Sequence, residues 1–274
     1  MPERLTNLYI TEQGASLHKR NEMIVCEKDE EEIVSRPLKD IGLVVLFGAV
    51  QVSTQALLAL LENGSDVSLM THNGHFRGRL TPALGKNSDL RMKQYQRCSD
   101  KDFCLRMGKN NNTAKVSNCL KLMKDYHYSA SNPIRFDSFK ELESLEKRLQ
   151  EAETMESLRG YEGAAARWYF RGFADALTCG VKFPGRRFHP STDPVNALLS
   201  FGYSFVAREI QGLIEAMGID PYIGVYHDIT YGRASLSLDI LEEFRHHLVD
   251  RLTLKLFNKR IIETEDFEVL ESDG

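Results

Sequence analysis

The chain has 274 residues, of which 42% are hydrophobic and 27% are charged, ordinary values for a globular protein. These values exclude collagen-like, disordered and disulfide-scaffold proteins. Because 35 Lys and Arg residues stand against 39 Asp and Glu residues, the net charge is −4, which argues against a uniformly basic protein that coats nucleic acid. A local basic groove on an acidic background stays open.

Residues 1–82 are predicted to form a small β-rich domain with one helix. Short apolar and β-branched runs, which are typical of strands, lie at 8–10, 23–25, 33–34, 41–47, 67–70 and 76–80. The acidic run Glu27–Glu32 is expected to separate two strands, and Asn73-Gly74 predicts a hairpin. Ser53 is expected to cap the helix, which Asn63-Gly64 would end.

After a linker at 83–87, residues 88–274 are predicted to form a mostly α-helical domain with an acidic tail. Phe139–Leu158 and Leu236–Phe257 carry apolar residues at helical spacing. The tail from Glu263 to Asp273 contains acids and no base, so it is expected to be solvated. The predicted fold class is therefore α+β, with a small β-rich N-terminal domain followed by a mostly α-helical domain.

The stretch Ile41–Leu61 is uncharged and nearly long enough to cross a bilayer, which takes about 20 residues. Polar residues such as Gln51 and Gln55 lie at its centre, where burial in lipid costs most. We therefore expect a buried strand and a short helix here, and no membrane association.

The sequence contains five cysteines, at positions 26, 98, 104, 119 and 179, and no CxxC pair. Zinc-ribbon spacing is absent, and the count is odd. These features predict reduced thiols without a catalytic or ligand role in a cytoplasmic protein.

Three patterns in the helical half carry residues suited to chemistry. Glu162 stands between glycines in Arg159–Ala166, and His227 follows an apolar run and a glycine. Asp239 and Glu242 are three residues apart, which places both on one face of a helix. Taken alone, each pattern is also typical of structure: an exposed Glu near a helix start, a structural His, and the charged face of an amphipathic helix.

Taken together, these side chains fit a hard divalent cation. Carboxylate oxygens suit Mg²⁺ or Mn²⁺, and one imidazole favours Mn²⁺. Such an ion acts on a phosphodiester by polarising the phosphoryl oxygen and stabilising the leaving oxygen. Spacing alone leaves open whether the side chains meet.

A basic pair, Arg186-Arg187, lies in the Pro- and Gly-rich segment Phe183–Pro190. Two guanidinium groups flanked by aromatic rings suit phosphate contact and base stacking. The alternative interpretation is scattered surface charge.

Six blocks, in order, resemble the CRISPR-associated integrases, the universal spacer-acquisition endonuclease family. They are Leu8–Ala15, Val44–Gly48, Arg159–Ala165, Asp193–Tyr203, Gly218–His227 and Leu236–Arg245. The block Asp193–Tyr203 is close to verbatim and highly specific. The resemblance covers residues 5 to about 260, and six ordered blocks are stronger evidence than any single motif.

This resemblance implies a metal-dependent DNA integrase and endonuclease that inserts foreign DNA fragments as spacers into a CRISPR array. The 3′-hydroxyl of the fragment would attack a phosphodiester at the repeat boundary. Carried over by position, Glu162, His227 and Glu242 would be the metal ligands, for Mg²⁺ or Mn²⁺, and Asp239 would be a fourth catalytic participant.

The implied partners are DNA, both as fragment and as CRISPR repeat, a second copy of the chain, and a small second adaptation protein that bridges two dimers. The strand-rich half would carry the self-association, and a role for a processing nuclease stays open. Arg186 and Arg187 would contact DNA, as would Lys115 and Asn118. Around these last two the sequence departs from the family, because Cys119 stands where Gln is expected and Asn110–Asn112 is unusual in a helix.

Two other functions stay open at this point. One is a structure-selective nuclease that hydrolyses branched DNA with water as the nucleophile. The other is a catalytically inert DNA-binding scaffold, against which the intact set of Glu162, His227 and Glu242 argues.

Overall fold

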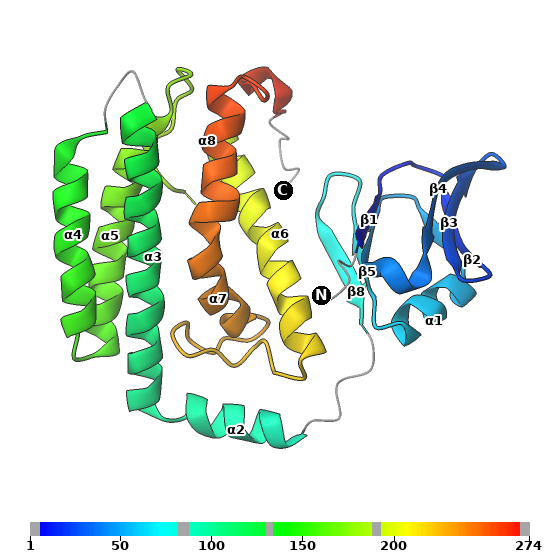
Figure 1. Cartoon of the computed structure of the whole chain (residues 1–274), viewed down its shortest axis with the longest axis horizontal. Helices are drawn as coiled ribbons and strands as arrows, with labels where there is room; N and C mark the ends of the chain where they lie inside the picture. The colour runs from blue at the N-terminus through cyan, green and yellow to red at the C-terminus, as the bar shows by residue number, and fades with distance from the viewer. Residues whose placement is uncertain (1–5, 82–87, 130–133, 188–192, 269–274) are drawn as a thin grey trace. The chain divides into compact units, whose positions relative to one another are not determined.

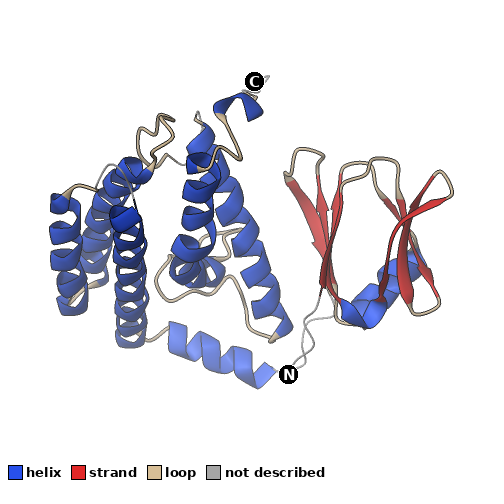
Figure 2. Cartoon of the chain, turned by 45° about the horizontal axis from the view of Figure 1, so that its top comes forward, coloured by secondary structure: helices blue, strands red, loops and turns tan. Residues whose placement is uncertain are grey.

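The computed structural model describes residues 6–81, 88–129, 134–187 and 193–268. The chain divides into two compact units, residues 1–87 with 215–218, and residues 88–214 with 219–274 (Figure 1). Among the described residues, the strands lie in the first unit and the second is helical (Figure 2). The predicted α+β fold class is confirmed, while the predicted linker 83–87 lies outside the described residues.

Two four-stranded sheets form the N-terminal unit. In its order across the sheet, the first consists of β1 (Thr6–Ile10), β5 (Ile41–Phe47), β7 (Asp66–Met70) and β8 (Phe76–Leu80). The second consists of β4 (Glu31–Pro37), β3 (Met23–Lys28), β2 (Ser16–Arg20) and β6 (Gln51–Val52). Strand β5 pairs in parallel with both β1 and β7, and this central position explains its continuous apolar sequence.

Local sequence accounts for the turn between β3 and β4 and for the start of the helix in this unit. Asp29 and Glu30 both adopt positive φ, 53° and 67°, and form the tight turn between β3 and β4 inside the predicted acidic separator. Helix α1 (Thr54–Glu62) begins as predicted, because the Ser53 side chain accepts a hydrogen bond from the Ala56 N–H at 3.2 Å.

Strands β2 and β6 have no counterpart among the predicted strands. Strand β2 carries a single buried apolar side chain, Leu17, and β6 has only two residues. Both depend on pairing for their conformation: β2 pairs with β3 on one edge and with β6 on the other. Leu17 joins a core that includes Ile24, Val44 and Leu60.

Long helices make up the second unit (Figure 1). They are α2 (Ser88–Cys98), α3 (Lys101–Ser129), α4 (Phe136–Glu151), α5 (Met155–Ala176), α6 (Pro194–Ala216), α7 (Ser235–Arg245) and α8 (Arg251–Asn258). Helices α3, α4 and α5 pack against one another, and α7 packs against α3. None of the described helices has the length and apolar character needed to cross a membrane. The uncharged stretch 41–61 forms β5, β6 and most of α1.

The predicted helix Phe139–Leu158 is wrong in its continuity, because α4 ends at Glu151 and α5 begins at Met155. The Thr154 side chain accepts the Ser157 N–H at 3.1 Å, and the Ser157 hydroxyl accepts the Thr154 N–H at 3.3 Å. This reciprocal cap starts a new helix in the middle of a continuous apolar pattern.

The second predicted helix, Leu236–Phe257, is continuous but not uniform. A π-helical segment, His246–Asp250, lies between α7 and α8. Such segments insert an extra residue into a helical turn and are frequent at functional sites.

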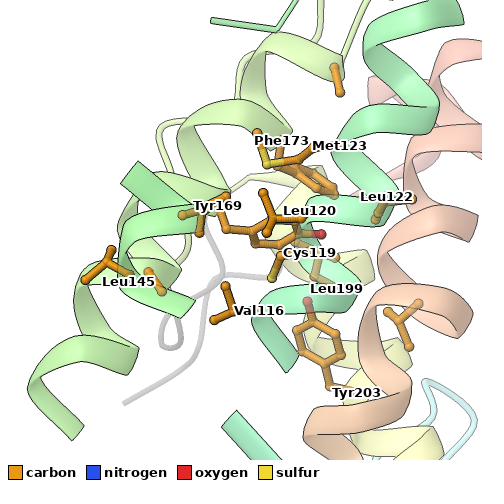
Figure 3. Close-up of a cluster of buried hydrophobic side chains, with 14 of the residues drawn as sticks. Val116, Cys119, Leu120, Leu122, Met123, Leu145, Tyr169, Phe173, Leu199 and Tyr203 are labelled. Carbon is orange, nitrogen blue, oxygen red and sulfur yellow. The ribbon is translucent and has the colours of Figure 1, made fainter. Parts of the chain in front are cut away.

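Apolar side chains from α3, α4, α5 and α6 form the core of the helical unit (Figure 3). Among its members are Val116, Cys119, Leu120, Met123, Leu145, Tyr169, Phe173, Leu199 and Tyr203. Tyr169 and Tyr203 bring hydroxyl groups into this core, and each therefore needs a buried partner.

Candidate metal and DNA site

Two of the predicted metal ligands meet at one lysine. Glu162 lies inside α5 and is half-buried, so the alternative interpretation of an exposed residue near a helix start is wrong, and Glu242 lies on α7. The Lys115 ammonium, on α3, contacts Glu162 Oε1 and lies 2.5 Å from Glu242 Oε2. Lys115 is 7% exposed. Three helices therefore place two carboxylates around one buried positive charge.

A second cation, Arg245, holds Glu242 from one helical turn further along α7. Its Nη1 lies 2.8 Å from Glu242 Oε1 and 3.0 Å from Oε2. Burial alone would raise the pKa of Glu242, but Arg245 and Lys115 bring that pKa well below its usual value. Burial lowers the pKa of Lys115, and the neighbouring Glu242 and Glu162 more than reverse this, so its pKa is raised. Glu242 is ionised and Lys115 is charged at neutral pH.

His227 is held by a different residue. Its Nδ1 lies 2.7 Å from Asp239 Oδ1, and Asp239 is 2% exposed. The Asp239 carboxylate also accepts the backbone N–H groups of Val225 at 2.6 Å, Tyr226 at 3.1 Å and His227 at 2.9 Å. Asp239 therefore positions the loop that carries His227. With Nδ1 engaged, Nε2 is the ring nitrogen left to contact a ligand.

Gly224 is required by this arrangement. A Cβ atom at this position would lie 2.6 Å from Asp239 Oδ2 and 2.9 Å from the Ser235 backbone carbon. The glycine before His227 thus permits close approach of the loop to α7. By contrast, a Cβ at Gly160 or Gly163 would meet nothing within 4 Å, so these glycines are not needed for packing within the described part of the chain.

Arg159 and Asn111 complete the frame of the site, and sequence reasoning missed both. Arg159 Nη2 lies 3.0 Å from the Tyr226 carbonyl oxygen and 2.5 Å from Asp228 Oδ1, so α5 grips the residues on both sides of His227. Asn111 Nδ2 lies 2.6 Å from the Asp239 carbonyl oxygen and ties α3 to α7. The spacing Arg159-x-x-Glu162, one helical turn, was an available signal for Arg159.

Two cavities border the site. One, of about 710 Å³, is lined by Lys115 and Glu162, and the other, of about 460 Å³, by His227 and Glu242. The Arg245 side chain lines both. Within the described ranges, no three His, Cys, Asp or Glu side chains are already arranged to hold a metal ion. The structure thus joins Glu162 to Glu242 and His227 to Asp239, in two neighbouring pairs.

The donor set nevertheless fits a hard divalent ion. Glu162 and Glu242 already share one cation, the Lys115 ammonium, which shows that their carboxylates lie close enough to act on a common charge. Carboxylate oxygens with one imidazole are ligands of Mg²⁺ and Mn²⁺.

The predicted DNA contacts differ in their surroundings. Arg186 is half-buried, with Nη1 2.9 Å from Asn196 Oδ1 and Nη2 3.1 Å from Ser200 Oγ, whereas Arg187 is exposed. Asn196 is fully buried in the near-verbatim block, and it also accepts the Arg187 N–H at 3.0 Å. Residues 188–190 of this segment lie outside the described residues.

Lys115 and Asn118 have protein partners in the structure, and their role in DNA contact stays a prediction. Lys115 is turned toward the two carboxylates. Asn118 is half-buried, with Nδ2 3.0 Å from the Glu243 carbonyl oxygen and Oδ1 3.0 Å from His247 Nε2. The unusual run Asn110–Asn112 is accommodated inside α3, where Asn112 donates to the Gly108 carbonyl oxygen at 2.9 Å.

A buried polar network lies beside the site. Asp250, at the end of the π-helical segment, accepts hydrogen bonds from the hydroxyls of Tyr169, at 2.6 Å, and Tyr203. The Arg245 guanidinium carbon lies 4.1 Å above the centre of the Tyr203 ring. Asp250 thus orients the ring on which Arg245 rests, and through Arg245 it supports Glu242.

His246 and Cys119 form a second buried contact, with His246 Nε2 3.0 Å from Cys119 Sγ. Burial, then Arg245 and Lys115, lower the pKa of His246 well below its usual value, so the imidazole is neutral. Burial raises the pKa of the Cys119 thiol well above its usual value, which is typical of an inert thiol. All five cysteines are unpaired.

Comparison with known proteins decides the family. Residues 8–274 match the family model described as CRISPR associated protein Cas1. The chain belongs to the Cas1 family. It is 32% identical to "CRISPR-associated endonuclease Cas1 1" of Chlorobaculum tepidum, covering 99% of this chain and 81% of that protein. It is also 32% identical to a "CRISPR-associated exonuclease Cas4/endonuclease Cas1 fusion" of Geobacter sulfurreducens, covering 95% of this chain and 48% of the fusion.

Solved structures agree with this assignment. The Cas1 protein TM1797 of Thermotoga maritima is 25% identical, with a TM-score of 0.82, and the match covers 97% of this chain and 84% of that one. A chain of a Cas6-RT-Cas1–Cas2 complex is 25% identical with a TM-score of 0.78, covering 99% of this chain and 30% of that one. The expectation of a CRISPR-associated DNA endonuclease and integrase of this family is confirmed, and nucleases of this family are generally metal-dependent.

Replacing Asp239 with Asn tests its positioning role. One accepting oxygen becomes an NH₂ group that faces backbone N–H donors, so we expect the free energy of unfolding to fall by about 1–3 kcal/mol. Urea unfolding measures this, and hydrogen exchange at Val225–His227 should accelerate. Asp137→Asn, an exposed change in the first turn of α4, is the matched control and should cost less than about 1 kcal/mol. Equal effects of the two changes would contradict the assignment.

His246 predicts a pH dependence of stability. The unfolded chain takes up a proton near pH 6.5, whereas folded His246 stays neutral, so stability declines as pH falls below about 6.5. The contribution of His246 to the free energy of unfolding changes by up to about 1.4 kcal/mol per pH unit. His246→Gln should remove it between pH 7 and 5 in urea titrations, and the exposed control His72→Gln should not. An unchanged pH profile in His246→Gln would refute the assignment.

Proposed function

We propose that Glu162, Glu242 and His227 bind one divalent ion, Mg²⁺ or Mn²⁺, at which this chain inserts DNA fragments into a CRISPR array. The observation that carries the proposal is the pair of carboxylates, from α5 and α7, that share one cation. His227, fixed by Asp239, borders the same helix α7 and lines a cavity together with Glu242. When bound, the ion supplies charge stabilisation at the scissile phosphodiester.

Other side chains of this Cas1-family chain hold the proposed ligands in place. Asp239 holds His227 through Nδ1, so that Nε2 is available as a ligand atom. Arg245 fixes the orientation of Glu242, and Arg159 fixes the loop of His227 relative to the helix that carries Glu162. DNA supplies the nucleophile, the 3′-hydroxyl of the incoming fragment. The catalytic groups of the protein therefore position reactants and balance charge, and form no covalent intermediate.

Replacing each proposed ligand should strongly reduce strand joining, and joining is compared only for variants that circular dichroism shows to be folded. We expect Glu162→Gln, Glu242→Gln and His227→Ala each to reduce joining by at least about a hundredfold, the scale of losing one strong electrostatic contact at a reaction centre. An integration assay on supercoiled DNA, with Mg²⁺ or Mn²⁺, measures joined products, and circular dichroism and DNA affinity accompany it.

Glu156→Gln, an exposed change in the first turn of α5, is the matched control. Joining at the parental rate by folded Glu162→Gln that binds DNA would rule out the metal site. Cleaved products without joined products would indicate the structure-selective nuclease, and DNA binding without either product would indicate the inert scaffold.

Arg186 and Arg187 are proposed to contact DNA phosphates. Both side chains line the larger cavity, next to Glu162. Replacing both with Ala should weaken DNA binding and reduce the magnitude of its salt slope by about two, since each phosphate contact contributes about one. The adjacent exposed pair Lys147 and Arg148 on α4, both changed to Ala, is the control. Unchanged affinity and slope in the Arg186/Arg187 variant would exclude this segment from the DNA path.

The proposed assembly contains two copies of this chain, joined through the strand-rich unit, and a small second protein that bridges two such dimers. The resemblance to a chain of a Cas1–Cas2 complex supports a protein partner, and the fusion with Cas4 in a relative supports a processing nuclease. We place this activity in the cytoplasm, where the DNA substrates are. Light scattering with and without residues 1–82 tests the dimer, which the shortened chain should not form.

A further inference from the structure

The charges around the two shared carboxylates already balance before any metal ion binds. Glu162 and Glu242 contribute two negative charges, and Lys115 and Arg245 contribute two positive charges. Glu242 is fully engaged, because Oε1 accepts from Arg245 and Oε2 contacts Lys115. A site that awaits a divalent cation would ordinarily present uncompensated negative charge.

We propose that Lys115 is a built-in competitor of the metal ion, which makes tight metal binding depend on DNA. This inference rests on the metal site proposed above. A divalent ion bound among these four charged groups would give them a net charge of +2, of which the Asp239 carboxylate beside His227 would offset only one. At a partly buried position such an excess is costly, and each phosphodiester that enters brings one negative charge. The negative charge of the DNA therefore favours binding of the ion, and the positive charge of the ion favours binding of the DNA.

The position of Lys115 supports a role as competitor over that of a direct phosphate contact. Its side chain is nearly buried, and its ammonium lies between the carboxylates of two different helices. A surface lysine would contact phosphate without touching the ligand carboxylates. Lys115 also lines the cavity that contains Glu162, Arg186 and Arg187, so DNA bound there would face its ammonium.

The coupling must be reciprocal. If DNA raises the affinity for the ion, the ion raises the affinity for DNA by the same factor, and couplings of this kind are typically about 5- to 150-fold. The consequence is that the ion is held tightly only when a DNA substrate is present. Removal of Lys115 should increase metal affinity in the absence of DNA and weaken this dependence.

Manganese chloride is the probe, and electron paramagnetic resonance counts the free ion. For the parental protein we expect the affinity for Mn²⁺ to increase at least about fivefold when a short duplex with a 3′ overhang is added. Lys115→Met, which keeps the length and removes the charge, should bind Mn²⁺ at least about fivefold more tightly without DNA, and DNA should add little. Mn²⁺ should also raise its melting temperature more than that of the parent.

Matched variants separate the possible failures. Lys124→Met removes an exposed lysine from the same helix and should leave Mn²⁺ binding unchanged. Glu162→Gln, alone and combined with Lys115→Met, reports whether the ion binds at the proposed site. The same variant measured with DNA gives the amount of Mn²⁺ that the DNA itself binds. Lys115→Gln repeats the loss of charge if the Met variant does not fold.

The outcomes are distinct. If Glu162→Gln leaves Mn²⁺ binding unchanged with and without DNA, the proposed metal site is wrong, and this inference fails with it. If Glu162→Gln abolishes binding while the Lys115 variants bind Mn²⁺ no more tightly than the parent, the metal site stands and the competitor role is overturned. A parental affinity for Mn²⁺ that DNA does not alter overturns it as well.

Discussion

Buried charged side chains connect helices α3, α5 and α7 at one point. The Lys115 ammonium between Glu162 and Glu242 is the contact on which the arrangement depends, because each helix contributes one charge. Removing one member of such a buried set leaves an uncompensated charge, which is far costlier than losing an exposed ion pair. The cluster therefore imposes one registry of three helices, and it does so at the site proposed above for catalysis.

A second set of polar contacts converts this registry into the orientation of individual side chains. The Asp239 carboxylate accepts hydrogen bonds from backbone N–H groups of the loop, and its Oδ1 also contacts His227 Nδ1. Asp250 performs a similar task for the tyrosines, one of which supports Arg245. The two aspartates lie on one continuous helical segment, on either side of Glu242, so one segment orders both flanks of the site.

Much of this organisation was predictable from residue patterns, and the remainder depends on tertiary contacts. The central strand and the capped helix after it follow from local sequence, since an apolar run and a Ser cap act over few residues. Strand β2 does not, because its conformation comes from pairing with β3 and β6. In the site, residue type and spacing identified Glu162, His227 and Glu242 as candidates. Spacing could not reveal that Lys115 stands between two of them, because its partners lie 47 residues away or more.

The π-helical segment has a consequence for sequence change by insertion and deletion. Each residue of a helix turns the following side chains by about 100°. Loss of one residue from His246–Asp250 would restore an ordinary α-helix, which is the easier local geometry. Because the extra residue is absorbed within one widened turn, the helix after it would keep nearly its present direction, whereas loss of a residue from the regular turns of α7 would rotate Asp250 away from the hydroxyls of Tyr169 and Tyr203. This short segment should therefore tolerate the loss of one residue better than the regular turns of α7 do.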